Sequence, residues 1–235
     1  MTLFDKYIPK IIISSILAIT VCTLYLIQAV NVIQASLYYT CVMLCFVLTL
    51  CFVKLTPTKL PITVALFCAC VADYFLILNY SVTHHPQDQI YGMLAFCALQ
   101  CCFTVYTYFI IKNPKLKIAM LITRVTVTLC IICVMPILQF GLLEILCAVY
   151  IVNFFITLLI VATQIKTRWL MFIGLLLFFI CDIFVGLSNG GAALFHLQNV
   201  AWLTAHNYSF YFYVPGLLLI ALSSVWSEKL HNLTK

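Results

Sequence analysis

Long apolar stretches separated by short polar connections run along the whole chain. Eight of these stretches are long enough for a membrane-spanning helix, which needs about 20 apolar residues. They cover residues 11–30, 36–53, 61–80, 90–111, 118–138, 141–162, 169–187 and 207–226. The pattern predicts an all-α bundle of eight transmembrane helices. It leaves no separate soluble domain, so residues 1–235 are expected to form a single integral membrane domain.

The composition supports the membrane interpretation. Hydrophobic residues make up 66% of the 235 positions and charged residues only 8%, whereas a soluble domain has roughly 45–50% and about 25%. This excludes a soluble globular protein. The net charge of +6 is spread thinly along the chain and forms no basic face, which excludes nucleic-acid binding. The 13 cysteines lie in apolar runs, where they are expected to fill space between helices. Neither a metal nor a cofactor is expected.

Lysine and arginine residues gather in alternate connections and in both tails. All but one of them would lie on the same side of an eight-helix bundle, namely Lys6, Lys10, Lys54, Lys59, Lys112, Lys115, Lys117, Lys166, Arg168, Lys229 and Lys235. Because basic residues are concentrated on the cytoplasmic side, both termini are predicted to be cytoplasmic in a multi-pass protein of the cell membrane. The exception, Arg124, lies within a span and is expected to extend toward the inner headgroups.

Two spans share a short similar segment. Residues 65–80 and 174–189 align without gaps when Asp73 is placed on Asp182, and each contains a small residue, Asp, any residue and Phe. The two segments belong to spans that are four apart and therefore run in the same direction. The similarity suggests a parallel repeat of two four-helix halves.

Two aspartates within the spans are the strongest candidates for function, because carboxyl groups in a membrane are costly and usually functional. At 1.5 Å per helical residue, Asp73 lies about 10 Å and Asp182 about 8 Å from the outer end of its span. Tyr213 lies about 9 Å deep and Gln100 about 15 Å. We therefore expect both aspartates to face one polar pocket that opens outward. The alternative is that each carboxyl is protonated and joins helices by hydrogen bonds.

Other polar residues are expected to lie at the outer surface. Glu144, close to the outer end of its span, is interpreted as interfacial. His84, His85 and Asp88 are interpreted as a polar turn. The connection 188–206 is apolar and contains adjacent glycines, so it is predicted to be either a lid over the aspartates or an interfacial turn.

The polar positions follow an order that is typical of one family. A small residue precedes Asp late in the third and seventh spans, the fourth span has Gly, Phe and an amide at intervals of four, and the eighth opens with tyrosines. The residues are Ala72-Asp73, Gly92, Phe96, Gln100, Cys181-Asp182, Tyr211, Tyr213 and the run LLLIALSS. The chain thereby resembles the YhhN family, eight-span membrane proteins that include lysoplasmalogenases. It departs from the family at Ala72, Cys181 and Gln100, where the family has Gly, Ser and His.

The resemblance implies an enzyme of lipid metabolism that hydrolyses the vinyl-ether bond of lysoplasmalogens without a cofactor. Its substrate would be a lysophospholipid-like molecule taken from the membrane lipid. Asp73 and Asp182 would divide the general acid and general base work. Gln100, Tyr213 and Tyr211 would position water or the ether oxygen. Because Gln100 replaces a histidine, it can form hydrogen bonds but cannot carry a proton.

Two other functions fit the same residues. A proton-coupled transporter of lipids or small amphiphiles could use both aspartates as a relay, but it would favour broken spans at matching positions in the two halves. Pro136 and Pro215 do not correspond under the offset that aligns Asp73 with Asp182. A non-catalytic binding or scaffold protein would explain the change at Gln100.

Overall fold

The computed structural model describes residues 3–30, 35–52, 56–194 and 209–233. Side chains are described for residues 12–26, 35–50, 56–80, 82–186 and 210–225. Within these ranges the chain is helical apart from short connections. The helices are α1 (Leu3–Val30), α2 (Ala35–Phe52), α3 (Leu60–Asp73), η1 (Tyr74–Asn79), α4 (Tyr80–Thr83), α5 (Pro86–Ile110), α6 (Pro114–Ile137), α7 (Leu142–Ala162), α8 (Ile165–Leu194) and α10 (Ser209–Leu233).

Five of the described helical segments are long and apolar enough to cross a membrane: Leu60–Asn79, Pro86–Ile110, Pro114–Ile137, Leu142–Ala162 and Ile165–Gly186. Three shorter apolar helical segments accompany them: Ile12–Leu26, Ala35–Leu50 and Phe210–Val225. The protein is therefore a helical bundle of the kind found in multi-pass membrane proteins. That the three shorter segments also cross the membrane, which would make eight crossings, stays a prediction.

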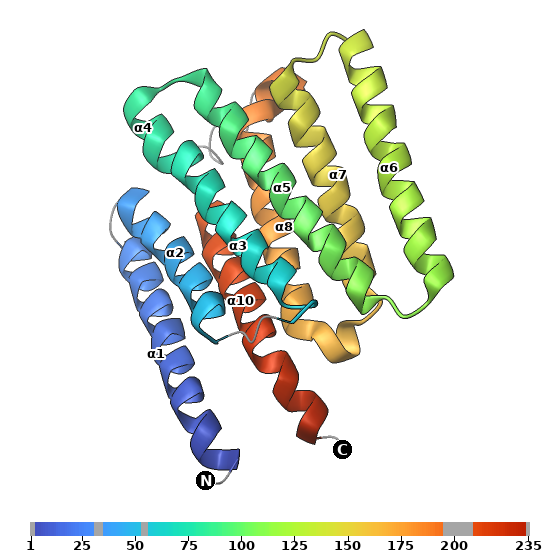
Figure 1. The fold of residues 1–235 in the computed structure, drawn as a ribbon. Coiled ribbons are helices and arrows are strands. Elements are labelled where there is room, and N and C mark those ends of the chain that lie inside the picture. The colour runs from blue at the N-terminus through green and yellow to red at the C-terminus, as the bar shows by residue number, and fades with distance from the viewer. Residues whose placement is uncertain (1–2, 31–34, 53–55, 195–208, 234–235) are drawn as a thin grey trace.

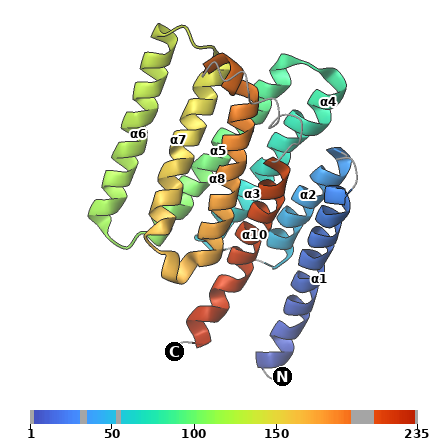
Figure 2. The same ribbon diagram turned by 180° about the vertical axis from the view of Figure 1, so that it is seen from behind.

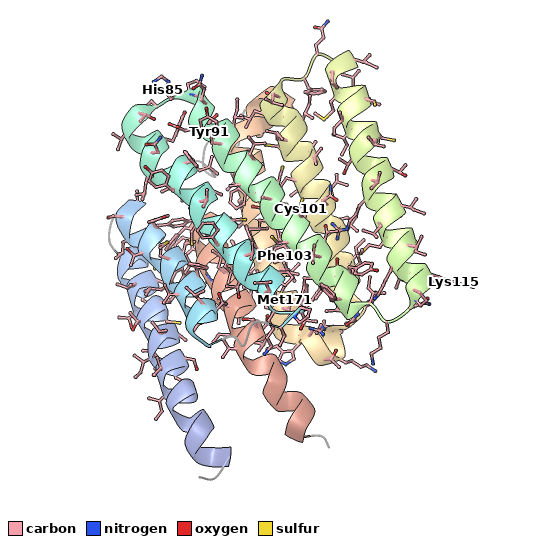
Figure 3. All side chains as sticks on the ribbon, viewed as in Figure 1. His85, Tyr91, Cys101, Phe103, Lys115 and Met171 are labelled. Carbon is pink, nitrogen blue, oxygen red and sulfur yellow. The ribbon has the colours of Figure 1, made fainter. Side chains whose placement is uncertain are left out.

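Successive long helices run in opposite directions, so that α1 begins and α10 ends at the same end of the bundle (Figures 1 and 2). Lys115 lies at this end and His85 at the opposite one (Figure 3), and we name the two ends after these residues. Among the described connections, those at the Lys115 end contain the basic residues, and those at the His85 end contain none. The connections with basic residues therefore all lie at one end of the bundle, as the charge pattern of the sequence predicts. That the Lys115 end is cytoplasmic stays a prediction.

Glycines allow two pairs of helices to approach closely. A Cβ atom added to Gly174 of α8 would lie 2.8 Å from the carbonyl oxygen of Gly216 in α10, so the two backbones are in direct contact there. A Cβ atom on Gly92 of α5 would overlap the side chain of Leu76 in η1. These pairs correspond to spans 3 and 4 and to spans 7 and 8. A close glycine contact at the same place in each half would be expected from the parallel repeat of two four-helix halves. That repeat stays a prediction.

A proline inside α10 provides one of the contacts between α10 and α1. Pro215 has no backbone N–H, so the carbonyl oxygen of Tyr211, four residues earlier, lacks its usual helical partner. The hydroxyl group of Tyr25 in α1 donates a hydrogen bond to this oxygen at 3.2 Å. The exposed carbonyl left by the proline is thus satisfied by a side chain from a neighbouring helix.

The expectation for Arg124 is wrong. Its side chain is buried rather than extended toward the headgroups, because polar groups of α7 bind it inside the bundle. The guanidinium donates to the backbone oxygen of Asn153 at 3.0 Å and to the hydroxyl oxygen of Thr157 at 2.8 Å. Asn153 in turn donates to Thr128 of α6 at 3.1 Å. Apart from this polar contact, α6 exposes most of its apolar side chains at the edge of the bundle (Figure 1).

The helix boundaries differ from the expected ones mainly at the ends. Helix α5 begins at Pro86 rather than residue 90, and α8 continues to Leu194 rather than stopping at 187. The beginning of the expected 188–206 connection is therefore helical, while residues 195–208, including most of the segment expected to be a lid or a turn, lie outside the described residues. Near its start, α8 is interrupted at Arg168, which has φ −133° and ψ 32°.

The turn between α4 and α5 agrees with the interpretation of His84, His85 and Asp88. His84 ends α4 with a positive φ of 52°. The carboxylate of Asp88 accepts hydrogen bonds from the amide of Asn79 at 2.9 Å and from the hydroxyl of Thr83. These contacts close the corner at the His85 end of the bundle.

Candidate functional site

Asp73 is the last residue of α3 and points into the bundle. Only 3% of its surface is exposed. Its Oδ2 atom accepts a hydrogen bond from the hydroxyl group of Tyr213 in α10 at 2.8 Å. The helix changes to the wider π form over Tyr74–Asn79, directly after Asp73. Short π segments inside α-helices are often found at functional sites, because they change the direction in which side chains point.

Asp182 of α8 forms a second pair of the same kind. Its Oδ2 atom accepts a hydrogen bond at 2.7 Å from the hydroxyl group of Tyr150 in α7. Tyr150 was not predicted as a site residue, because it lies in an apolar run without any charged neighbour. Oδ1 of both Asp73 and Asp182 accepts no hydrogen bond from the described residues, which leaves one oxygen of each carboxyl available for another partner.

Aromatic rings connect the two carboxyl–tyrosine pairs. The ring of Phe178 meets that of Tyr213 edge to face at 4.9 Å between centroids, and it lies 6.1 Å from the ring of Phe96. Phe96 in turn lies 5.5 Å from Tyr150. On the other side of Tyr213, Tyr38 of α2 stacks in parallel at 5.5 Å. The two carboxyl groups therefore belong to one aromatic-lined region.

The two aspartates are close enough to influence each other electrostatically. Asp73 lies within electrostatic range of Asp182, and Tyr38 lies within range of both. The structure thus brings the two sequence-selected aspartates together from α3 and α8. Interactions between charges are strong in such an environment because little water is present to screen them.

Gln100 of α5 is the remaining polar group at this site. It lies near the hydroxyl group of Tyr150 and is 4% exposed. Neither its amide nitrogen nor its amide oxygen forms a hydrogen bond of normal geometry with the described residues, although the amide lies within range of a weak interaction with the Tyr150 hydroxyl. Such an unsatisfied polar group costs about 1–3 kcal/mol. It is the kind of group that a bound ligand or water would satisfy.

Tyr211 does not belong to this cluster. It is 38% exposed, and its ring packs edge to face on Tyr25 of α1 at 6.3 Å. Tyr211 and Tyr213 are two residues apart, which corresponds to a rotation of about 200° around a helix. The two side chains must therefore face different directions, and it is Tyr213 that donates the hydrogen bond to Asp73.

The close contact between α8 and α10 positions much of the site. Gly174, Phe178 and Asp182 recur every four residues and so share one face of α8. The contact of Gly174 with Gly216 holds this face against α10. Phe178 then packs against Tyr213, and Asp182 lies one turn closer to the His85 end.

The carboxyl and phenol groups at the site can exchange protons, and the Gln100 amide can form hydrogen bonds. These two carboxyls, two phenols and one amide lie among aromatic rings, with Asp73 buried and Asp182 partly buried, an environment suited to acid–base chemistry. Among the described residues, no group of three or more His, Cys, Asp or Glu side chains is arranged to hold a metal ion. The cysteines that the structure describes are all free thiols.

The order of helices and the position of the two aspartates can be compared with known proteins. The model of the YhhN family matches residues 34–224. The chain belongs to the YhhN family. No curated protein and no solved structure matches it.

The YhhN positions named from the sequence have clear places in the fold. Gly92 allows α5 to contact η1, the segment that begins immediately after Asp73. Phe96, four residues further on, is part of the aromatic connection, and Gln100 follows at the next turn. Helix α5 of this YhhN protein therefore contributes one face to the region between the two carboxyls.

Proposed function

We propose that this YhhN protein is a membrane-embedded hydrolase that cleaves the vinyl-ether bond of lysoplasmalogens. Asp73 and Asp182 would act as the acid–base pair. Tyr213 and Tyr150 hold these carboxyl groups in place by hydrogen bonds at 2.8 Å and 2.7 Å. Gln100 would bind the attacking water or the ether oxygen.

The reaction needs one proton donor and one proton acceptor. A protonated carboxyl gives its proton to the vinyl carbon farther from the ether oxygen, and the electrons of the double bond form the new C–H bond. The resulting oxocarbenium ion is attacked by water at the carbon next to oxygen, while the second carboxylate takes a proton from this water. The hemiacetal then breaks its C–O bond: its hydroxyl group loses a proton as the carbonyl forms, and the leaving oxygen gains a proton, which releases an aldehyde and the headgroup alcohol. The proton that the second carboxyl took from water passes to the first carboxyl, so the reaction consumes only water.

The combination of paired carboxyls with an unsatisfied amide carries the proposal. Polar groups that merely join helices are expected to satisfy one another, because an unpaired polar group in a membrane interior is costly. Here the two carboxyls each bind a tyrosine, yet the Gln100 amide, which lies near the Tyr150 hydroxyl, forms no hydrogen bond of normal geometry with the described residues. This favours a site prepared for a ligand over a purely structural contact.

The direct test uses the purified protein in detergent with a lysoplasmalogen. We expect release of a fatty aldehyde, and no release from the matched lysolipid with a saturated alkyl ether. In D₂O, the aldehyde should carry one deuterium on the carbon next to the carbonyl group, since the proton is transferred to that carbon.

Absence of aldehyde from well-folded protein would contradict the proposal. If the same protein in vesicles instead moved the lysolipid across the bilayer in response to a proton gradient, the transporter alternative would replace it. Binding without either activity would support a non-catalytic role.

A further inference from the structure

An apolar groove lies between α2 and α3, which are neighbours in both views of the ribbon (Figures 1 and 2). It has a volume of about 180 Å³. Helix α2 contributes Tyr39, Met43 and Phe46, and the segment formed by α3 and η1 contributes Phe67, Val71 and Tyr74. We refer to it as the α2/α3 groove.

The groove follows the axes of the helices. Its lining residues recur at intervals of three or four on both sides, so each set forms a stripe along one helix face. From Tyr39 to Phe46 the stripe extends about 10 Å. The side is open to the surroundings, since Phe67 is 50% and Tyr74 is 45% exposed. A long, narrow and apolar shape of this kind suits a hydrocarbon chain.

One end of the groove lies at the level of the site. Tyr39 follows Tyr38, which stacks on Tyr213, and Tyr74 follows Asp73. Tyr39 also lies within electrostatic range of Asp73. The other end, at Phe46 and Phe67, is farther toward the Lys115 end. The groove therefore begins at the level of Asp73 and extends away from the His85 end.

We propose that the α2/α3 groove binds the single hydrocarbon chain of the lysolipid substrate and places its ether end beside Asp73. This inference rests on the proposed function, because it assigns the groove to the substrate of that site. If the headgroup of the lipid lies at the His85 end, its hydrocarbon chain points toward the Lys115 end, and the groove runs in the same direction. The phenol groups of Tyr39 and Tyr74 lie where the apolar chain meets its polar end, a position that suits an apolar ring with a polar tip.

The test uses a lysolipid with a saturated alkyl ether and a photoreactive diazirine halfway along the chain. This probe is not hydrolysed, so labelling reports binding independently of turnover. The full-length protein is placed in nanodiscs of diacyl phospholipid, irradiated and digested, and the labelled peptides are identified by mass spectrometry. We expect label on the segments that contain Met43, Phe46 and Phe67, and its loss when excess unlabelled alkyl lysolipid is added.

Variants distinguish binding of the lipid chain in the groove from catalysis at Asp73. Val71→Trp fills the groove and should abolish this labelling, whereas Val125→Trp, at a position of α6 that is 57% exposed, should not. Met43→Trp fills the groove from α2 and provides a second test if Val71→Trp does not fold. Asp73→Asn should retain labelling even where aldehyde release is lost.

Two results would overturn the inference. If the label were distributed over exposed α6, the probe would not bind the groove, and if excess lysolipid did not reduce groove labelling, the groove would hold ordinary bilayer lipid. Either result together with normal aldehyde release would leave the proposed hydrolase intact. Competitive groove labelling without any aldehyde release would support lysolipid binding while contradicting hydrolysis.

Discussion

The hydroxyl group of Tyr213 donates a 2.8 Å hydrogen bond to Asp73, although 140 residues separate them in the chain. This bond joins α3 to α10 in the interior of the bundle. Tyr150 and Asp182 repeat the arrangement between α7 and α8. Two carboxyls of similar depth are thus each held by a tyrosine of another helix.

Removing the tyrosine hydroxyl should lower activity as well as stability. Tyr213→Phe and Tyr150→Phe each remove one hydrogen bond, which should lower the free energy of unfolding by about 1 kcal/mol. Because the carboxyl loses the group that orients it, aldehyde release should fall at least about tenfold. Tyr91→Phe, at a 48% exposed position, is the matched control. Equal activity in the three variants would show that the tyrosines have no positioning role.

Substitution of Gly174 should disturb the site from a distance. In Gly174→Ala, the new Cβ atom would lie 2.8 Å from the backbone oxygen of Gly216, so α8 and α10 must separate. We expect a loss of about 1–3 kcal/mol in stability and reduced aldehyde release, because Phe178 and Tyr213 move apart. Gly186→Ala of the same helix has nothing within 4 Å of its Cβ atom and should be neutral. The measurement is thermal unfolding in detergent together with the activity assay.

The unsatisfied amide of Gln100 predicts opposite effects on stability and activity. Gln100→Met keeps the length of the side chain but removes two buried atoms that have no described partner. The variant should therefore gain about 1 kcal/mol or more in stability while losing aldehyde release. A loss of stability would mean that the amide is satisfied in the folded protein, and unchanged activity would mean that it binds neither water nor substrate.

The buried position of Arg124 can be tested with a double-mutant cycle. Asn153→Ala removes polar contacts of α7 with α6. If Arg124 depends on these contacts, the effect of Asn153→Ala on the free energy of unfolding should differ between the wild type and Arg124→Met by about 0.5–3 kcal/mol. Additive effects would instead indicate that Arg124 extends toward the headgroups, as the sequence alone suggested.

Much of the fold could be predicted from the sequence because each apolar run is bounded by polar connections. The long helices follow these runs, and their alternating direction follows from the short links. Helix ends were less predictable: α8 extends to Leu194 although its last turns contain two adjacent glycines, which disfavour a helix. The π segment after Asp73 left no signal in the hydrophobic pattern.

Part of the site could be predicted, because side chains at the same depth along neighbouring helices can meet. Asp73 and Tyr213 were expected at similar depth, and they are bonded. The position of a residue along a helix does not tell which way its side chain points around the helix axis. For this reason Tyr211 was predicted together with Tyr213, although its side chain faces α1. Tyr150 was missed because a tyrosine in an apolar run resembles a packing residue. Arg124 was misplaced because the polar residues of α7 that bind it were not considered.

The most direct measurement of the central claim is aldehyde release from a lysoplasmalogen by Asp73→Asn and Asp182→Asn, compared with the wild type and with the exposed-carboxyl control Glu144→Gln. An amide keeps the size and hydrogen-bonding capacity of the carboxyl but cannot exchange its proton. We predict that both Asn variants fold normally and release no aldehyde, while Glu144→Gln retains full activity. Wild-type activity in both Asn variants would contradict the claim that these two carboxyl groups carry out acid–base catalysis.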